Sequence, residues 1–142
     1  MLFLYFSIFL TVLSNIFYHI FQKSIAASIN PIISLIITYI SAIIISLLIL
    51  PFYPDKTGLI DSIKGLNWSS FALGGAIVGL EMGFLLAYRA GWNIGLAAVF
   101  SNVAVAVFLI PIGLLIYKEN LTLMNLLGIM FCITGLVLIR QA

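Results

Sequence analysis

Residues 75–93 read GAIVGLEMGFLLAYRAGWN, a long apolar segment that carries one acidic residue, Glu81, near its centre. Small residues recur at every fourth position of this segment, at Gly75, Gly79, Gly83, Ala87 and Gly91. Such a row lets helices approach closely in a membrane, so we expect the first three glycines to serve helix packing. A charge at the bilayer centre costs roughly 2.5–3.5 kcal/mol on insertion scales, so Glu81 is a candidate functional residue.

The rest of the chain is equally apolar. Of its 142 residues, 64% are hydrophobic and 7% are charged, and the mean hydropathy is +1.30. A soluble domain of this size could not bury so much apolar surface, whereas runs of about 20 apolar residues match a bilayer core. Because backbone groups in lipid must bond internally, these runs are predicted to be helices. The sequence predicts an all-α, multi-pass protein of the cell membrane, and its net charge of +2 gives no reason to expect nucleic acid.

Hydropathy predicts five transmembrane helices in a single membrane domain, residues 1–142. Their expected bounds are 2–21, 31–50, 71–89, 94–117 and 121–139. The N-terminal segment has no basic start and no small-residue cleavage pattern, so we expect a first span rather than a signal peptide. The polar loop 51–68 contains apolar residues at helical spacing, which suggests a short interfacial helix anchored by Trp68.

Polar and aromatic residues of several spans could surround Glu81. Counting from the helix midpoints places Asn15 and Asn102 at a depth similar to that of Glu81. Aromatic rings near a carboxylate can stack on an organic cation. The candidate residues for substrate and proton binding are therefore Glu81, Asn15, Asn102, Tyr18, Tyr39 and Tyr88, with His19, Arg89 and Trp92 as secondary candidates.

Each candidate also has a plainer explanation. The asparagines could form ordinary interhelical hydrogen bonds, and Glu81 could be a hydrogen-bonded packing residue. His19 could be a solvated or packing residue, while Arg89 and Trp92 could mark the membrane interface. A single histidine without cysteine or acidic neighbours predicts no metal site. Nothing in the sequence suggests a cofactor or an enzyme.

The basic residues are balanced between the two sides that five spans would create. One side carries Lys56, Lys64 and Lys118, and the other carries Lys23, Arg89 and Arg140. Orientation follows an asymmetry of basic residues, and here three face three. We therefore expect that the chain could insert in both orientations, although a single orientation set by subtler features is the alternative.

Two blocks of the C-terminal half, AYRAGWNIGLAAVFSNV (87–103) and LLIYKENLTLMNLLGIMFCITGLVLI (114–139), resemble the EamA-like repeat of the drug/metabolite transporter superfamily. The matching positions are Glu119, Leu121, Thr122, Gly128 and Gly135. The resemblance implies a five-helix repeat, two of which form larger ten-helix members in inverted arrangement. It also implies a relation to the small multidrug resistance transporters, whose acidic residue in the first helix is absent here.

Together these features predict a secondary active transporter, in particular a proton-coupled exporter of a small organic solute, with a cationic or amphipathic solute favoured. An antiparallel homodimer in the lipid membrane would reproduce the ten-helix inverted repeat. Such a repeat would carry the solute across by alternating access. Gly128 and Gly135 lie on one face of the last span and could pack there, either against a second copy or within the same chain. The alternatives are a non-transporting assembly or regulatory subunit, or half of a heterodimeric transporter.

Overall fold

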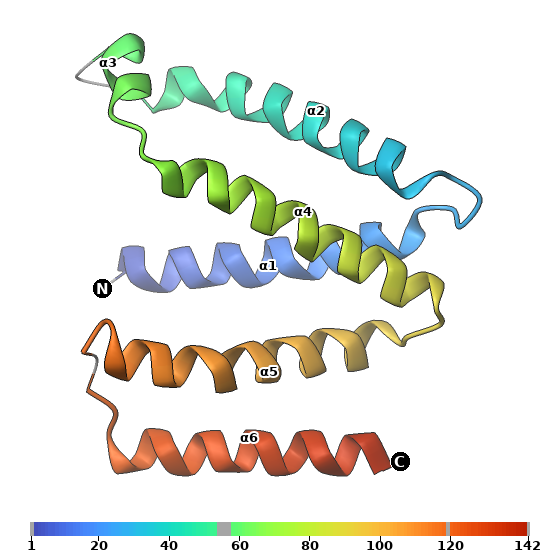
Figure 1. Ribbon diagram of the computed structural model, residues 1–142, viewed down its shortest axis with the longest axis vertical. Coiled ribbons are helices and arrows are strands. Elements are labelled where there is room, and N and C mark those ends of the chain that lie inside the picture. The colour runs from blue at the N-terminus through green and yellow to red at the C-terminus, as the bar shows by residue number, and fades with distance from the viewer. Residues whose placement is uncertain (1, 54–57, 119, 142) are drawn as a thin grey trace. The chain divides into compact units, whose positions relative to one another are not determined.

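The computed structural model describes residues 2–53, 58–118 and 120–141, which form helices joined by short connections (Figure 1). In chain order these are α1 (Leu2–Ser24), α2 (Pro31–Ile49), the 3-10 helix η1 (Leu50–Phe52), α3 (Leu59–Lys64), α4 (Trp68–Arg89), α5 (Ile94–Leu115) and α6 (Leu123–Gln141). The chain divides into two compact units, Met1–Ala90 and Gly91–Ala142. The all-helical class predicted from hydropathy is confirmed.

In the first unit α4 is the central helix, because it contacts both α1 and α2. Figure 1 shows α4 running between these helices and crossing α1 in its second half. Among the residues whose side chains are described, the buried ones of this unit lie near the α1–α2 connection and the last turns of α4. They are His19, Gln22, Leu35, Leu85 and Tyr88. The three long helices are therefore held together at one end.

The second unit consists of α5 and α6, which pack against each other as an antiparallel pair (Figure 1). Ala97 and Gly113 of α5 are buried. The helix α5 continues past Pro111 to Leu115, so the proline lies inside it.

Asparagine side chains begin two of the long helices. Oδ1 of Asn30 accepts a hydrogen bond of 2.9 Å from the backbone N–H of Ile32, and Oδ1 of Asn67 accepts one of 3.0 Å from Ser69. Each bond satisfies an N–H group that a first helical turn leaves without an internal partner. After α4, Gly91 adopts a φ of 97°, a conformation that favours glycine, and the chain leaves the helix there.

Three helices in the described part of the chain are long and apolar enough to cross a membrane. They are Pro31–Phe52, Trp68–Arg89 and Ile94–Leu115, each of 22 residues. A helix of this length extends about 33 Å, which covers a bilayer core of roughly 30 Å. A shorter apolar helix covers Leu123–Leu138. Five membrane spans, including α1 and α6, stay a prediction.

The observed helix ends differ slightly from the predicted bounds. The first helix extends beyond residue 21 to Ser24, and α2 ends at Ile49, where η1 takes over. The helix α4, which corresponds to the third predicted span, begins at Trp68 rather than at residue 71, because Asn67 caps it there. The helix α3 occupies the place of the predicted short helix, and Trp68 is the first residue of α4. An interfacial position of α3, anchored by Trp68, stays a prediction.

In the second unit, α5 ends at Leu115 instead of residue 117, and α6 covers Leu123–Gln141 instead of residues 121–139. Two residues of the sequence interpretation lie outside the described residues. They are Lys56, from the charge balance, and Glu119, from the family resemblance.

Candidate functional site

Several hydroxyl side chains inside the long helices are satisfied by their own helix. Each donates a hydrogen bond of 2.8–3.1 Å to the carbonyl oxygen four residues earlier, and the residues that do so include Thr11, Thr38, Ser41, Ser46 and Thr134. Such a bond removes the need for a partner on another helix. Polar atoms that this local arrangement does not satisfy are therefore the candidates for a functional site.

Glu81 lies on α4 where both α1 and α2 reach it. Gln22 of α1 donates a hydrogen bond of 2.7 Å from Nε2 to the backbone carbonyl oxygen of Glu81. Tyr39 of α2 is close enough to interact electrostatically with the Glu81 carboxylate. The Glu81 side chain is half-buried, and its atom Oε2 is buried without a hydrogen-bond partner among the described residues.

Two phenol groups near Glu81 share this condition. Oη of Tyr18 and Oη of Tyr39 are buried and have no hydrogen-bond partner in the described part of the chain. Both interact electrostatically with Glu81, and the Tyr39 hydroxyl comes close enough for a weak side-chain hydrogen-bond interaction with the carboxyl group, although the two groups do not reach full hydrogen-bond geometry. A buried polar group without a partner costs about 1–3 kcal/mol. These three atoms, from α1, α2 and α4, therefore form a cluster that a proton, a water molecule or a polar ligand would stabilise.

Tyr88 and His19 are bonded to each other. Oη of Tyr88 lies 2.7 Å from Nδ1 of His19, and both side chains are buried. Phe84 stacks against Tyr88, and its ring centroid lies 4.8 Å from that of His19 in an edge-to-face contact. Tyr88 is therefore unlike Tyr18 and Tyr39, because its hydroxyl already has a partner. His19 is a packed, hydrogen-bonded residue and not a solvated one.

Arg89 bonds to the α1–α2 connection. Its Nη2 atom donates to the carbonyl oxygens of Ile29 at 2.8 Å and of Ala26 at 3.3 Å. No ion pair joins Arg89 to Glu81 within the described residues, where the one ion pair is Asp61–Lys64 at 4.0 Å. Arg89 follows Glu81 by eight positions, which corresponds to about 12 Å along a helix, too far for a direct pair.

The two asparagine candidates lie in different units. Asn15 is exposed on α1, on the same side of that helix as Tyr18 and His19, since residues three and four apart share a face. Asn102 lines a groove of about 520 Å³ between α5 and α6, together with Asn125. The first unit thus brings Tyr18 and Tyr39 to Glu81, whereas an approach of Asn102 to Glu81 stays a prediction.

The remaining candidates are Trp92 and the packing glycines, and the glycines have open surroundings. Trp92 lies in the second unit, 45% exposed, with its ring in edge-to-face contact with Phe100. A Cβ atom added at any of the five packing glycines would meet nothing within 4 Å outside its own helix backbone. These positions are Gly75, Gly79, Gly83, Gly128 and Gly135. Their faces are therefore free within the described residues, and their predicted packing role needs a further surface.

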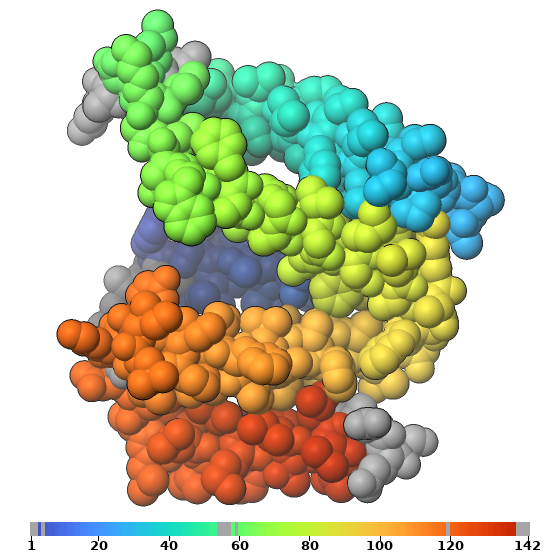
Figure 2. Space-filling model, viewed as in Figure 1, coloured from blue at the N-terminus to red at the C-terminus, as the bar shows by residue number. Residues whose placement is uncertain are grey.

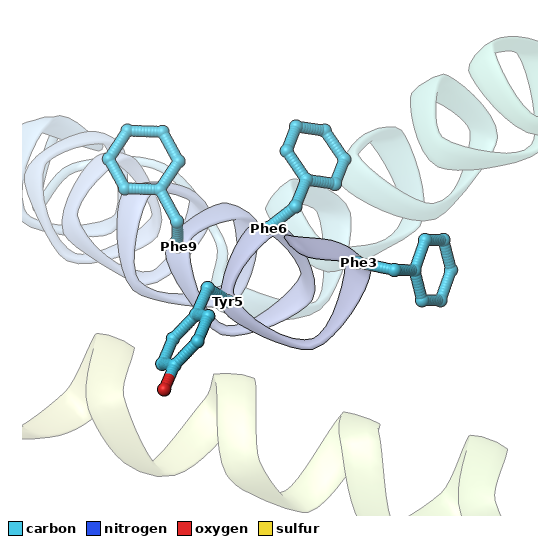
Figure 3. A pocket seen from close by; sticks show the side chains of 4 residues that line it. All are labelled: Phe3, Tyr5, Phe6 and Phe9. Atoms are coloured by element: carbon cyan, nitrogen blue, oxygen red, sulfur yellow. The ribbon is translucent and has the colours of Figure 1, made fainter. Parts of the chain in front are cut away.

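Figure 3 shows a hollow at the start of α1 that is lined by Phe3, Tyr5, Phe6 and Phe9. The four rings spread around the outside of the helix instead of converging, and all are largely exposed. No hydrogen-bonding or charged cluster accompanies them among the described residues. This arrangement suits contact with lipid better than the binding of a solute.

Gln22 is the site residue that the sequence interpretation did not single out. It follows His19 by three residues and Tyr18 by four. That spacing places all three on one helical face, which is the signal that could have identified it.

The structure thus defines a helical membrane protein with a carboxylate-centred polar cluster between three helices. The sequence matches the EamA-like transporter family over residues 2–141. The chain belongs to this family, which is consistent with the drug/metabolite transporter superfamily, and it is a multi-pass membrane protein of a transporter class. No curated protein and no solved structure shows a significant match to the chain.

Proposed function

We propose that the chain is a proton-coupled secondary transporter that exports a small organic solute by alternating access. The observation that carries this proposal is the cluster of three buried, unpartnered atoms, Oε2 of Glu81 and the hydroxyls of Tyr18 and Tyr39. A carboxyl group that holds either a proton or a solute, but not both at once, couples the movement of one to that of the other. Membership of a transporter family supports the same function.

The chemistry of the cluster favours a cationic or amphipathic solute. A carboxylate attracts a cation, and two phenol oxygens can accept further hydrogen bonds from an ammonium group. Phe84 lies edge-to-face with Tyr18, at a centroid distance of 5.9 Å, and adds an apolar wall. Aromatic faces near a carboxylate also attract cations directly.

We further propose that α1, α2, α4, α5 and α6 all cross the membrane and that two chains form an antiparallel homodimer. The balance of three basic residues on each side supports insertion in both orientations. An inverted pair would reproduce the repeat symmetry on which many secondary transporters rely. The open glycine faces of α4 and α6 offer surfaces for such close helix contact.

Flux measurements in proteoliposomes test the transport function. A pH gradient is imposed across the vesicles, and proton movement is followed with a trapped pH-sensitive dye while primary amines, quaternary ammonium ions, neutral solutes and anions are added in turn. We expect a solute-dependent proton flux in the wild-type protein and its loss in Glu81→Gln. Asp61→Asn is the matched control, because Asp61 is an exposed carboxylate paired with Lys64 outside the long helices.

Two results would contradict this proposal. If Glu81→Gln retained a proton flux that depends on solute, the carboxyl group would not be the coupling residue. If no solute class moved protons through the wild-type chain, a non-transporting subunit or a transporter that needs a second, different chain would be the better explanation.

A further inference from the structure

The packed end of the first unit lies on one side of the Glu81 cluster. All residues of α4 from Trp68 to Leu80 are exposed, as are residues 40–49 of α2 and the described side chains of α1 before Tyr18. Figure 2 shows the surfaces of α2 and α4 apart toward α3 and joined toward the α1–α2 connection. The helices therefore diverge on the α3 side of Glu81 and meet on the Arg89 side.

Two side-chain contacts close the Arg89 side. The first is the buried hydrogen bond between Tyr88 and His19, which ties the end of α4 to α1. Lys23 lies over the ring of Tyr88, with Nζ 5.7 Å from the ring centre, and covers the pair from outside. This contact joins helices that are far apart in the sequence, so it can break without unfolding either of them.

The second contact is the bonding of Arg89 to the α1–α2 connection. The guanidinium of Arg89 holds the carbonyl oxygens of Ala26 and Ile29, and its Nε atom is buried without a partner among the described residues. Arg89 follows Tyr88 directly in α4, so both contacts depend on the position of one helical turn. A movement of that turn away from α1 would release them together.

We propose that His19, Tyr88 and Arg89 form a gate that closes the Arg89 side of the Glu81 site, a role that rests on the transport function proposed above. In the structure this gate is closed, and the cluster of Glu81, Tyr18 and Tyr39 lies at its inner edge. Opening breaks the Tyr88–His19 bond and frees the connection from Arg89, which exposes the buried residues Leu85 and Leu35. The three gate residues thus act through the site's access and do not bind the solute.

Thiol labelling of purified protein in detergent micelles tests the gate without any transport. In a Cys132→Ser background, which removes the exposed native thiol, a reporter cysteine is placed at Leu85, which is 1% exposed, or at Leu35, which is 4% exposed. A charged, water-soluble maleimide reaches either reporter only when the packed end opens. Two reporters on different helices keep the test valid if one substitution fails to fold.

Tyr88→Phe removes the hydroxyl and retains the ring, so we expect labelling of both reporters to accelerate about fivefold, the effect of losing one typical hydrogen bond. His19→Phe should have the same effect, and the double variant should add little, since both changes remove one contact. Tyr53→Phe is the matched control, because Tyr53 follows η1 and is 77% exposed. In this variant the reporter cysteines should be labelled at the same rate as in the Cys132→Ser background without a tyrosine substitution.

The gate and the transport function can be contradicted separately. If labelling in Tyr88→Phe equalled labelling in Tyr53→Phe, the gate would be wrong even in an active transporter. If Tyr88→Phe accelerated labelling while the wild-type chain moved no solute in vesicles, the closing contact would stand and the transport function would be overturned. Accelerated labelling together with altered flux in Tyr88→Phe supports both.

Discussion

Gln22 of α1 donates a hydrogen bond of 2.7 Å from its side-chain amide to the backbone carbonyl oxygen of Glu81 in α4. A helical carbonyl oxygen has two lone pairs, and its own helix uses only one of them. Gln22 occupies the second, so α1 is fixed against α4 at the residue that carries the carboxylate. Because the bond goes to the backbone, it positions Glu81 while leaving Oε2 unpartnered.

Replacing Gln22 by leucine should therefore weaken the α1–α4 contact. The variant leaves the carbonyl with its helical bond only, and interhelical hydrogen bonds in membranes contribute about 1 kcal/mol or less. We expect a loss of this size in the free energy of unfolding, measured by titration with denaturing detergent in mixed micelles. Asn120→Leu, at an exposed amide of the α5–α6 connection, is the control and should change stability less.

The tyrosines of the first unit should respond in opposite ways to loss of their hydroxyl groups. Tyr39→Phe removes a buried oxygen that has no hydrogen-bond partner in the described residues, so stability should stay the same or rise. Tyr88→Phe leaves His19 without its partner and should lower stability by about 1 kcal/mol. Unfolding of both variants in the same detergent series measures the difference. Equal destabilisation would show that the Tyr39 hydroxyl has a partner in solution.

Tyr39→Phe also tests whether the Tyr39 hydroxyl contributes to solute binding and not only to packing. If Tyr39 contacts the solute, Tyr39→Phe should weaken solute binding by about tenfold or more while the fold is unharmed, since a hydrogen bond to a charged group contributes about 1.5 kcal/mol or more. Binding is measured by calorimetry or by solute-induced changes in tryptophan fluorescence. An unchanged affinity would remove Tyr39 from the site.

Hydropathy was sufficient to predict the long helices, because apolar runs and lipid thickness leave few other solutions. The predicted start of α2 at residue 31 agrees with the structure, whereas the start of α4 at Trp68 depended on Asn67, whose capping bond was not separated from the general polarity of the connection. The sequence also identified Glu81 as a candidate functional residue, since a single acidic residue in an apolar membrane helix is energetically costly wherever it packs.

Side-chain pairing between helices could not be predicted in the same way. The Tyr88–His19 bond depends on where α4 crosses α1, and periodicity gives the faces of helices but not their crossing point. Arg89 was expected at an interface, but its bonds to Ala26 and Ile29 depend on the path of a short connection. Its partners are backbone carbonyl oxygens, which every residue has, so the amino-acid types of the connection do not reveal them.

Arg89 offers a prediction about local order. Lysine keeps the charge at this position but carries it on a flexible stem, without the rigid planar guanidinium that fixes the directions of the two bonds from Nη2 to Ala26 and Ile29. We expect Arg89→Lys to accelerate amide hydrogen exchange in residues 25–30 by several-fold, with exchange in α5 and α6 unchanged. Hydrogen-exchange mass spectrometry measures both in one sample. Uniform acceleration along the chain would indicate global destabilisation and not a local role.

The glycine row of α4 should be sensitive to size only if another helix covers it. A Cβ atom at Gly79 meets no atom within 4 Å in the described residues outside its own helix backbone, and Gly79 is exposed, so we expect leucine there to leave the unit itself undisturbed. If a second copy packs on this row, Gly79→Leu should shift the protein toward monomers, as measured by single-molecule photobleaching in vesicles. Gly74→Leu is the matched control, because Gly74 is equally open but lies on a neighbouring row. The same oligomeric state in both variants would exclude this face from the interface.

Orientation in the membrane should follow small changes in charge. Lys118→Gln leaves two basic residues on its side against three on the other, and Arg140→Gln produces the opposite imbalance. Because the more basic side stays in the cytoplasm, each variant should insert predominantly one way, as read by a reporter fused to the C-terminus. If the active form is an antiparallel pair, each variant alone should lose most solute flux, and co-expression of the two should restore it. Full flux from either variant alone, in one orientation, would exclude the antiparallel homodimer while leaving the Glu81 site intact.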